Sequence, residues 1–150
     1  MKIIEAVRRN AVTVEPDTSI EATAQLMERS GVGALPVVDG GELVGIVTDR
    51  DIVCRGIAAN VANDARIDSL MSTPVHSVAV DADLQAAFAT FREHPVRRLV
   101  VTDGEGVVGM ITVDDLLINV SADLADLSRP VTGETIFGHR DAPVPRTADG

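Results

Sequence analysis

A threonine and an aspartate three residues apart follow a glycine at two places in the chain, in GIVTDRD (45–51) and GMITVDD (109–115). Residues at this spacing lie on one face of a helix in its first turn. The carboxylate of such a pair can accept hydrogen bonds from a ribose diol. The hydroxyl and the free N–H groups at the start of the helix can meet a phosphate oxygen. The spacing therefore suits a sugar phosphate better than a bare base or a metal ion.

The same spacing also has a purely structural interpretation. Thr48 as N-cap would accept a hydrogen bond from the N–H of Asp51, and the Asp51 carboxylate would reach back, as in a capping box. Gly45 and Gly109 likewise have two interpretations. They either allow a backbone or ligand to approach closely, or mark a bulge in a strand. The sequence leaves these alternatives open.

The paired motif belongs to a longer internal repeat. A shift of 64 residues places 12–53 on 76–117 without a gap, so every element and turn has the same length in both copies. Each copy predicts a strand, a helix, two strands joined by a tight hairpin, and a closing helix. The expected segments are strands at 11–14, 34–39, 42–48, 75–78, 98–103 and 106–112, and helices at 17–31, 49–59 and 113–127.

Apolar spacing predicts which helix faces are buried. Thr18 or Ser19 is the expected N-cap of the first long helix. The expected core stripes are Ile20, Ala24 and Met27 in the first copy and Leu84, Phe88 and Phe91 in the second. With aromatic residues at 2%, the core must be filled by Val, Ile, Leu, Ala and Met.

The expected fold class is α/β (α+β), with two β-α-β-β-α units packed around a pseudo-twofold axis, because one unit alone buries too little surface to be stable. The expected domains are residues 1–62 and 63–127. Residues 128–150 are rich in proline and glycine and are expected to form a flexible tail. Alternatively, Ile136 and Phe137 dock on a neighbouring subunit.

Composition narrows the classes of function. A net charge of −10 with few aromatic residues argues against nucleic-acid binding. The apolar runs are too short for a membrane span, and the first ten residues make a poor signal peptide, so we expect a cytoplasmic protein. The sequence has no metal-ligand spacing and no nucleophile paired with a base, so we expect neither a metal site nor an enzyme.

The single cysteine excludes an intrachain disulfide. Cys54 falls within an expected helix, and we expect it to be a small buried apolar residue. An intersubunit bridge or a reactive thiol is the alternative.

The ungapped repeat, with Gly-x-x-Thr-x-x-Asp closing each unit and the segments GALPVVD (33–39) and MSTP (71–74), resembles the CBS domain. Two CBS domains in tandem resemble a Bateman module. The resemblance covers residues 1 to about 120, and a stand-alone pair of this kind is similar to the hypoxic response proteins of actinobacteria. It implies a regulatory module that binds AMP, ADP, ATP or S-adenosylmethionine in two clefts, often as a homodimer.

The resemblance also implies which residues line each cleft, because each cleft combines strands of one domain with the Thr-x-x-Asp of the other. Cleft one would use Thr48, Arg50, Asp51, Val75, His76, Arg97 and Arg98. Cleft two would use Val12, Thr13, Ala34, Leu35, Thr112 and Asp115.

The two implied clefts differ in charge. Arg97 and Arg98 in cleft one suit phosphate, although they alternatively form surface ion pairs. Cleft two has no cation at the matching positions, and Asp114 replaces Arg50. It is expected to be empty or to hold an uncharged or cationic adenosyl ligand. His76 either lies where the edge of a bound base passes or is an exposed strand residue. His94 is expected to end a helix before Pro95.

Because no enzyme or channel domain is attached, the implied regulation acts on an unknown protein target in trans. Two alternatives stay open. One is a structural or protein-interaction pair with empty clefts, and the other is a hydrolase that acts on the bound nucleotide.

Overall fold

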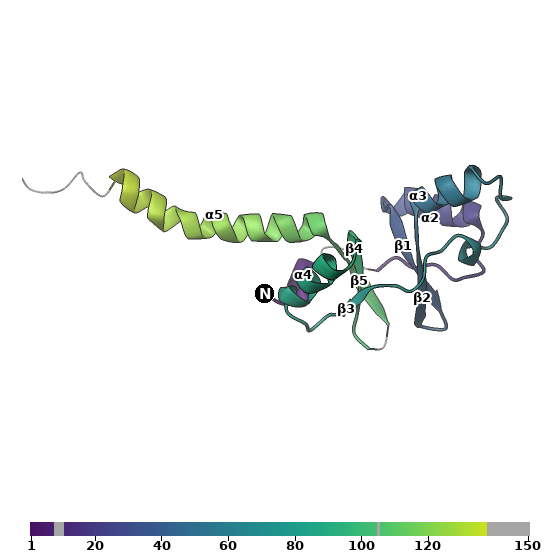
Figure 1. Ribbon diagram of the computed structural model, residues 1–150, viewed down its shortest axis with the longest axis horizontal. Helices are drawn as coiled ribbons and strands as arrows, with labels where there is room; N and C mark the ends of the chain where they lie inside the picture. Colours follow the sequence, from purple (N-terminus) through teal and green to yellow (C-terminus); the bar gives the residue numbers. More distant parts are fainter. Residues whose placement is uncertain (8–10, 105, 138–150) are drawn as a thin grey trace, which may run out of the picture. The chain divides into compact units, whose positions relative to one another are not determined.

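The computed structural model describes residues 1–7, 11–104 and 106–137, with side chains up to Arg129 (Figure 1). The chain divides into two compact units, Met1–Val113 and Asp114–Gly150. The first unit holds both copies of the repeat up to the start of the second closing helix.

The long helix of the first copy, α2 (Ile20–Ser30), starts and ends as its sequence predicts. Ser19 is the N-cap, and its side chain accepts a hydrogen bond from the N–H of Ala22 at 3.0 Å. Gly31 ends the helix in the left-handed conformation, with φ of 63°. Ile20 and Met27 are buried and Ala24 packs against the same core, so the predicted stripe is confirmed.

The first copy's sheet is a hairpin of β1 (Ala34–Asp39) and β2 (Glu42–Thr48), paired antiparallel. Gly40 and Gly41 turn the chain with φ of 56° and 88°, which glycine adopts without strain. The expected strand at 11–14 is reduced to a single parallel bridge between Val14 and Val37.

The second copy has a three-stranded sheet in the order β3-β4-β5. Here β3 (Ser77–Ala79) runs parallel to β4 (Arg98–Thr102), which pairs antiparallel with β5 (Val107–Thr112). The strand β3 begins two residues later than the sequence predicts. In α4 (Leu84–Glu93), Leu84 and Ala87 are buried, whereas Phe88 and Phe91 are only half-buried.

Both hairpins carry a bulge at the same place. Val37 lies opposite Gly45 and the next pair is Val38 with Leu43; in the second copy, Val101 lies opposite Gly109 before the register shifts. The bulge interpretation of both glycines is therefore confirmed. A Cβ at Gly45 would also lie 2.9 Å from Cγ of Met71, so a side chain of this chain closely approaches that glycine.

The closing helices differ from their predicted form. In the first copy, α3 (Asp49–Asp51) continues as the π-helix η1 (Ile52–Ile57). Cys54 is exposed, so the prediction that it is buried is wrong. The reason is that this helix turns Ile52 and Gly56 inward, four residues apart, and Cys54 lies between them on another face.

The second closing helix, α5 (Val113–Phe137), runs ten residues past the predicted end at 127. The expectation that the chain is irregular from residue 128 onward is therefore wrong for 128–137. Residues 138–150 of the predicted tail lie outside the described residues, as do the side chains of Ile136 and Phe137. No helix in the described part of the chain is long and apolar enough to cross a membrane.

The segments before the two copies are exchanged between them. Residues around α1 (Ile3–Ala6) bond to the second copy: the N–H of Ile3 donates to the carbonyl of Ala82 at 2.9 Å. The equivalent segment, η2 (Ile67–Ser69), bonds to the first copy: the N–H of Ile67 donates to the carbonyl of Thr18 at 2.7 Å. Ile3 and Ile67 are both fully buried.

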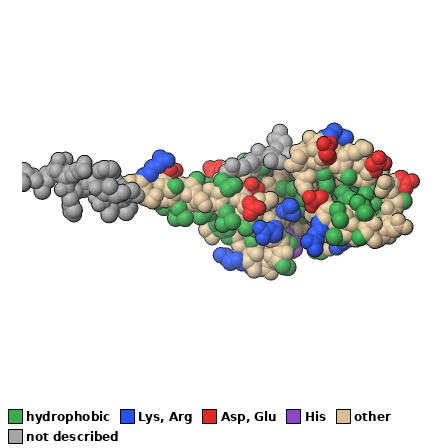
Figure 2. All heavy atoms as spheres, turned by 90° about the horizontal axis from the view of Figure 1, so that it is seen from above, with side chains coloured by type: hydrophobic (Ala, Val, Ile, Leu, Met, Phe, Trp, Pro, Cys, Tyr) green, Lys and Arg blue, Asp and Glu red, His purple; other side chains and the backbone are tan. Residues whose placement is uncertain are grey.

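Aliphatic residues fill the core, as the low aromatic content predicts. The buried cluster of the first copy comprises Val14, Ile20, Met27, Leu35, Val37, Val47, Ile52, Ile67 and Leu70. On the face shown in Figure 2, basic and acidic side chains are interspersed and apolar side chains are exposed among them.

Candidate functional site

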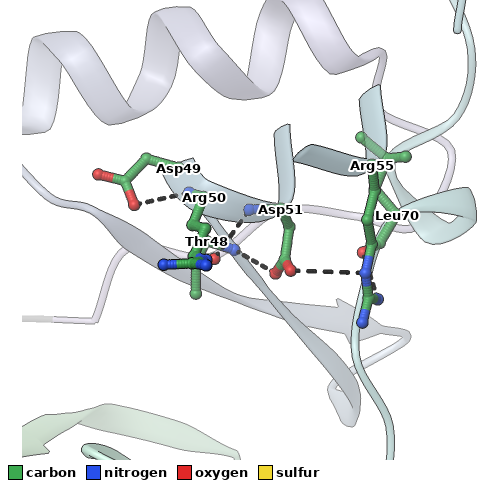
Figure 3. A network of polar contacts seen from close by, with 6 residues as sticks. All are labelled: Thr48, Asp49, Arg50, Asp51, Arg55 and Leu70. Carbon is green, nitrogen blue, oxygen red and sulfur yellow. Dashed lines mark hydrogen bonds and ion pairs between the residues drawn. The ribbon is translucent and has the colours of Figure 1, made fainter. Parts of the chain in front are cut away.

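Thr48 and Asp51 meet where β2 passes into α3 (Figure 3). Thr48 Oγ1 accepts a hydrogen bond from the N–H of Asp51 at 3.1 Å. The N–H of Thr48 donates to Oδ2 of Asp51 at 2.9 Å. The capping-box interpretation is therefore confirmed, and it holds the hydroxyl and the carboxylate in defined positions at the start of the helix.

Capping does not use all the acceptor capacity of this pair. Each carboxylate oxygen has two lone-pair directions, and only Oδ2 of Asp51 is engaged by the cap. Oδ1 lies 3.8 Å from Nε of Arg55, and the Asp51 side chain remains 15% exposed. The structure thus permits both roles for these residues, since a ligand hydroxyl can still be accepted while the cap is formed.

Arg50 lies between the two motif residues, and its side chain is exposed. Its backbone N–H donates to Oδ1 of Asp49 at 2.8 Å, and the N–H of Asp49 donates to the carbonyl of Gly33 at 3.0 Å. The first turn is therefore tied back to the chain just before β1.

The other residues predicted for cleft one lie at the start of β3 and β4. The carbonyl of His76 accepts a hydrogen bond from the N–H of Val100 at 3.1 Å. Arg97 and Arg98 are both exposed, and Arg98 lies opposite Thr112 in the β4-β5 pair. That these residues and the Thr48 pair face a common ligand stays a prediction.

His76 also contacts a residue that was not assigned to the site. Its ring centroid lies 4.1 Å from that of His94, with an angle of 30° between the ring planes. His94 follows the last residue of α4, which confirms that it ends a helix. The two histidines are 18 positions apart, and no sequence pattern indicated their contact.

The residues predicted for cleft two are placed less favourably for side-chain recognition. Ala34 and Leu35 are 2% and 0% exposed, so neither presents an exposed side chain to a ligand. Val12 is half-buried and Thr13 exposed. Thr112 ends β5 and Asp115 lies in the first turn of α5.

Arg55 is the polar residue near the motif that sequence reasoning missed. Its position four residues after Asp51 on a helix is the signal that would have indicated a contact. Elsewhere, a polar hollow of about 220 Å³ is lined by Glu15, Pro16, Asp17, Asp39, Gly40 and Arg66, none of them a predicted site residue. Within the described residues, no three His, Cys, Asp or Glu side chains gather in a group that would hold a metal ion.

Two relatives and two solved structures illustrate what this chain resembles. It is 36% identical over 107 residues to the CBS domain-containing protein YhcV of Bacillus subtilis, covering 71% of this chain and 76% of that protein. It is also 36% identical over 100 residues to Hypoxic response protein 1 of Mycobacterium tuberculosis, covering 65% and 70%. The crystal structure of Hypoxic Response Protein I, which holds two coordinated zinc ions, matches with a TM-score of 0.69 at 30% identity, covering 78% of this chain and 97% of that one.

The CBS domain protein PAE2072 of Pyrobaculum aerophilum, solved in complex with AMP, matches with a TM-score of 0.69 over 77% of this chain and 90% of that one. At 22% identity this likeness shows the fold alone. The model of the CBS domain matches twice, at residues 3–55 and 67–122, each match containing one copy of the repeat. These matches cover most of the chain, which therefore belongs to the CBS domain family as a tandem pair.

Proposed function

We propose that this CBS pair is a regulatory module that binds an adenosine-containing ligand: AMP, ADP, ATP or S-adenosylmethionine. The observation that carries the proposal is the capping box of Thr48 and Asp51, which orients a hydroxyl and a carboxylate while leaving Oδ1 of Asp51 outside the cap. A ribose diol needs such an acceptor, and the start of a helix favours a phosphate.

Two further points support this function. The AMP complex of PAE2072 demonstrates that the fold can hold an adenine nucleotide. The exposed guanidinium groups of Arg50, Arg97 and Arg98 belong to the residues assigned to cleft one, and arginine forms bidentate contacts with phosphate. A phosphorylated ligand is therefore expected in cleft one.

Cleft two is proposed to have a different preference. Ala34 and Leu35 are buried and apolar, and Asp114 occupies the position that corresponds to Arg50. A negative charge at this position disfavours a phosphate. Cleft two is thus proposed to stay empty or to bind an uncharged or cationic adenosyl ligand such as S-adenosylmethionine.

The module is proposed to act in the cytoplasm as a homodimer and to pass the state of its ligand to a protein target in trans. Its net charge of −10 fits a small-molecule or protein partner better than a nucleic acid.

Isothermal titration with AMP, ATP and S-adenosylmethionine tests this function on the full chain and on two matched variants, Asp51→Asn and Asp115→Asn. Asparagine keeps an oxygen that can accept the capping hydrogen bond but removes the charge. Asp51→Asn is expected to weaken AMP binding about tenfold or more, which corresponds to roughly 1.4 kcal/mol. Asp115→Asn is expected to leave AMP binding within about twofold.

Other outcomes would redirect the assignment. A cooperatively folding protein that binds none of the three ligands is a structural or interaction pair with empty clefts. Steady release of phosphate from ATP would instead identify a hydrolase. A ligand at about 100 times its dissociation constant adds roughly 2.7 kcal/mol of stability, so a thermal shift gives an independent check on binding.

A further inference from the structure

A chain of contacts leads from the candidate ligand-binding carboxylate to the segment that joins the two copies (Figure 3). Oδ1 of Asp51 lies 3.8 Å from Nε of Arg55. Nη1 of the same guanidinium donates to the carbonyl oxygen of Leu70 at 3.3 Å. The guanidinium thus forms an ion pair with the carboxylate and donates a hydrogen bond to the carbonyl.

Leu70 begins a connector, residues 70–76, that is attached to the first copy by successive contacts. The Leu70 side chain is 2% exposed and lies against Gly56, with Cδ1 3.1 Å from the site of a Cβ on that glycine. Met71 covers Gly45 in β2. Ser72 exchanges two backbone hydrogen bonds with Ile46, at 2.8 and 3.1 Å.

The connector then runs through Pro74 to Val75 and His76, which are assigned to cleft one. Its start therefore touches the guanidinium that lies beside Asp51, and its end carries the residues expected on the other side of the ligand. A change in the hydrogen bond from Arg55 to the Leu70 carbonyl therefore affects the attachment of this short segment to the first copy.

The second copy carries a different residue at this position. Asn119 corresponds to Arg55, and its side-chain amide donates to the backbone carbonyl of Asp115 at 2.8 Å, within its own helix. An asparagine at this position lacks both the positive charge and the reach of arginine. The two contacts of Arg55 therefore depend on a side chain that the second copy replaces.

We propose that Arg55 is a positioning residue that couples occupancy of Asp51 to the connector, the segment 70–76 that leads into the second copy of the repeat. A ligand hydroxyl that bonds to Oδ1 of Asp51 competes for the attraction that holds the guanidinium, so the hydrogen bond to the Leu70 carbonyl loosens. The part of this inference that concerns ligand rests on the proposed function, whereas the attachment of the connector by Arg55 does not.

Hydrogen exchange read by mass spectrometry on the amides of 70–73 tests the proposal in the full chain, because Val75 and His76 are themselves assigned to the ligand cleft. The variants are Arg55→Gln and the matched control Arg29→Gln, which removes an exposed arginine from α2. Without nucleotide, Arg55→Gln is expected to raise connector exchange about two- to fivefold, in line with the loss of one exposed polar contact. Arg29→Gln is expected to leave it unchanged.

The second arm adds AMP at a saturating concentration set by isothermal titration. AMP is expected to raise connector exchange in the wild type and in Arg29→Gln. It is expected to have no further effect in Arg55→Gln, although AMP still binds that variant. A purely structural role for Arg55 would leave the response to AMP intact.

The proposal is overturned if the connector amides of Arg55→Gln and Arg29→Gln exchange at the same rate without nucleotide. It is also overturned if AMP changes the exchange rate of the connector equally in both variants. If AMP binds none of the three proteins, the proposed function fails, while the comparison without nucleotide still decides whether Arg55 attaches the connector.

Discussion

The two copies of the repeat share a backbone plan but differ in the chemistry they carry. Both have the same hairpin, the same bulge at a glycine and the same exchange of an incoming segment. At the motif, however, the first copy links Asp51 to Arg55, whereas the second has Asn119 bonded within its own helix. The comparison teaches that the bulge, the turn and the Thr-x-x-Asp motif are kept in both copies, whereas the side chains around the motif, Arg50 against Asp114 and Arg55 against Asn119, differ.

The exchanged segments differ in the same way. Lys2 forms an ion pair with Asp83 of the copy on which it docks, with Nζ and Oδ1 2.9 Å apart. Its equivalent, Arg66, instead pairs with Asp68 in its own segment at 2.8 Å. The residue that corresponds to Asp83 is Ser19, which caps α2. One copy thus uses a charge pair where the other uses a helix cap.

The largest expected effect concerns the bulge. Gly45→Ala introduces a Cβ within 2.9 Å of Cγ and 3.2 Å of Cβ of Met71, and we expect overpacking to lower the free energy of unfolding by about 1–3 kcal/mol. Urea denaturation followed by circular dichroism measures it.

The matched control is Gly106→Ala in the other hairpin, where a Cβ would meet no atom within 4 Å. We expect a change below about 0.5 kcal/mol there. Combining Gly45→Ala with Met71→Ala should cost less than the sum of the two single changes, and strict additivity would contradict the steric explanation.

A smaller effect is expected at the start of the two long helices. Ser19→Ala removes the acceptor for the N–H of Ala22 and should cost about 1 kcal/mol. Asp83→Ala, at the equivalent position, should cost less, because Asp83 makes no capping hydrogen bond and its ion pair with Lys2 is exposed. Equal losses in the free energy of unfolding, measured by urea denaturation, would contradict this difference between the two helix starts.

The smallest expected effect is a dependence on pH. The hydrogen bond from Lys2, followed by its charge, lowers the pKa of Asp83 below 3.8. A carboxyl group whose pKa is lowered in the folded state stabilises the protein at pH values above its pKa in the unfolded state. This contribution is lost as the pH falls through the folded-state pKa. The stability difference between wild type and Lys2→Met should therefore shrink below about pH 4.

The same test applies to the other segment. The hydrogen bond from Arg66 lowers the pKa of Asp68, so the difference between wild type and Arg66→Met should shrink over the same range. Urea midpoints measured between pH 2.5 and 7 give both profiles. A difference that grows on acidification would contradict the assigned ion pairs.

Much of this scaffold was predictable because it depends on local rules. The alternation of apolar residues, the Asp-Gly turns and the cap at Ser19 each depend on residues within a few positions of one another. The exposure of Cys54 was not predicted, since it required the phase of the closing helix relative to the core. The continuation of α5 to Phe137 overrides a composition that favours irregular structure.

By itself the sequence determined the two ungapped copies and the order of strands and helices in each, because spacing and residue type decide them. It offered the bulge at each glycine and the capping box at Asp51 only as alternatives, and the structure decided them. Only the tertiary structure decided that Met71 covers Gly45, that the incoming segments exchange partners, and that Arg55 bridges Asp51 to the Leu70 carbonyl. Apolar periodicity predicts which face of a helix or strand is buried, but not which residues cover it. The covering residues come from distant parts of the chain, and their contacts exist only once the path of the backbone is set.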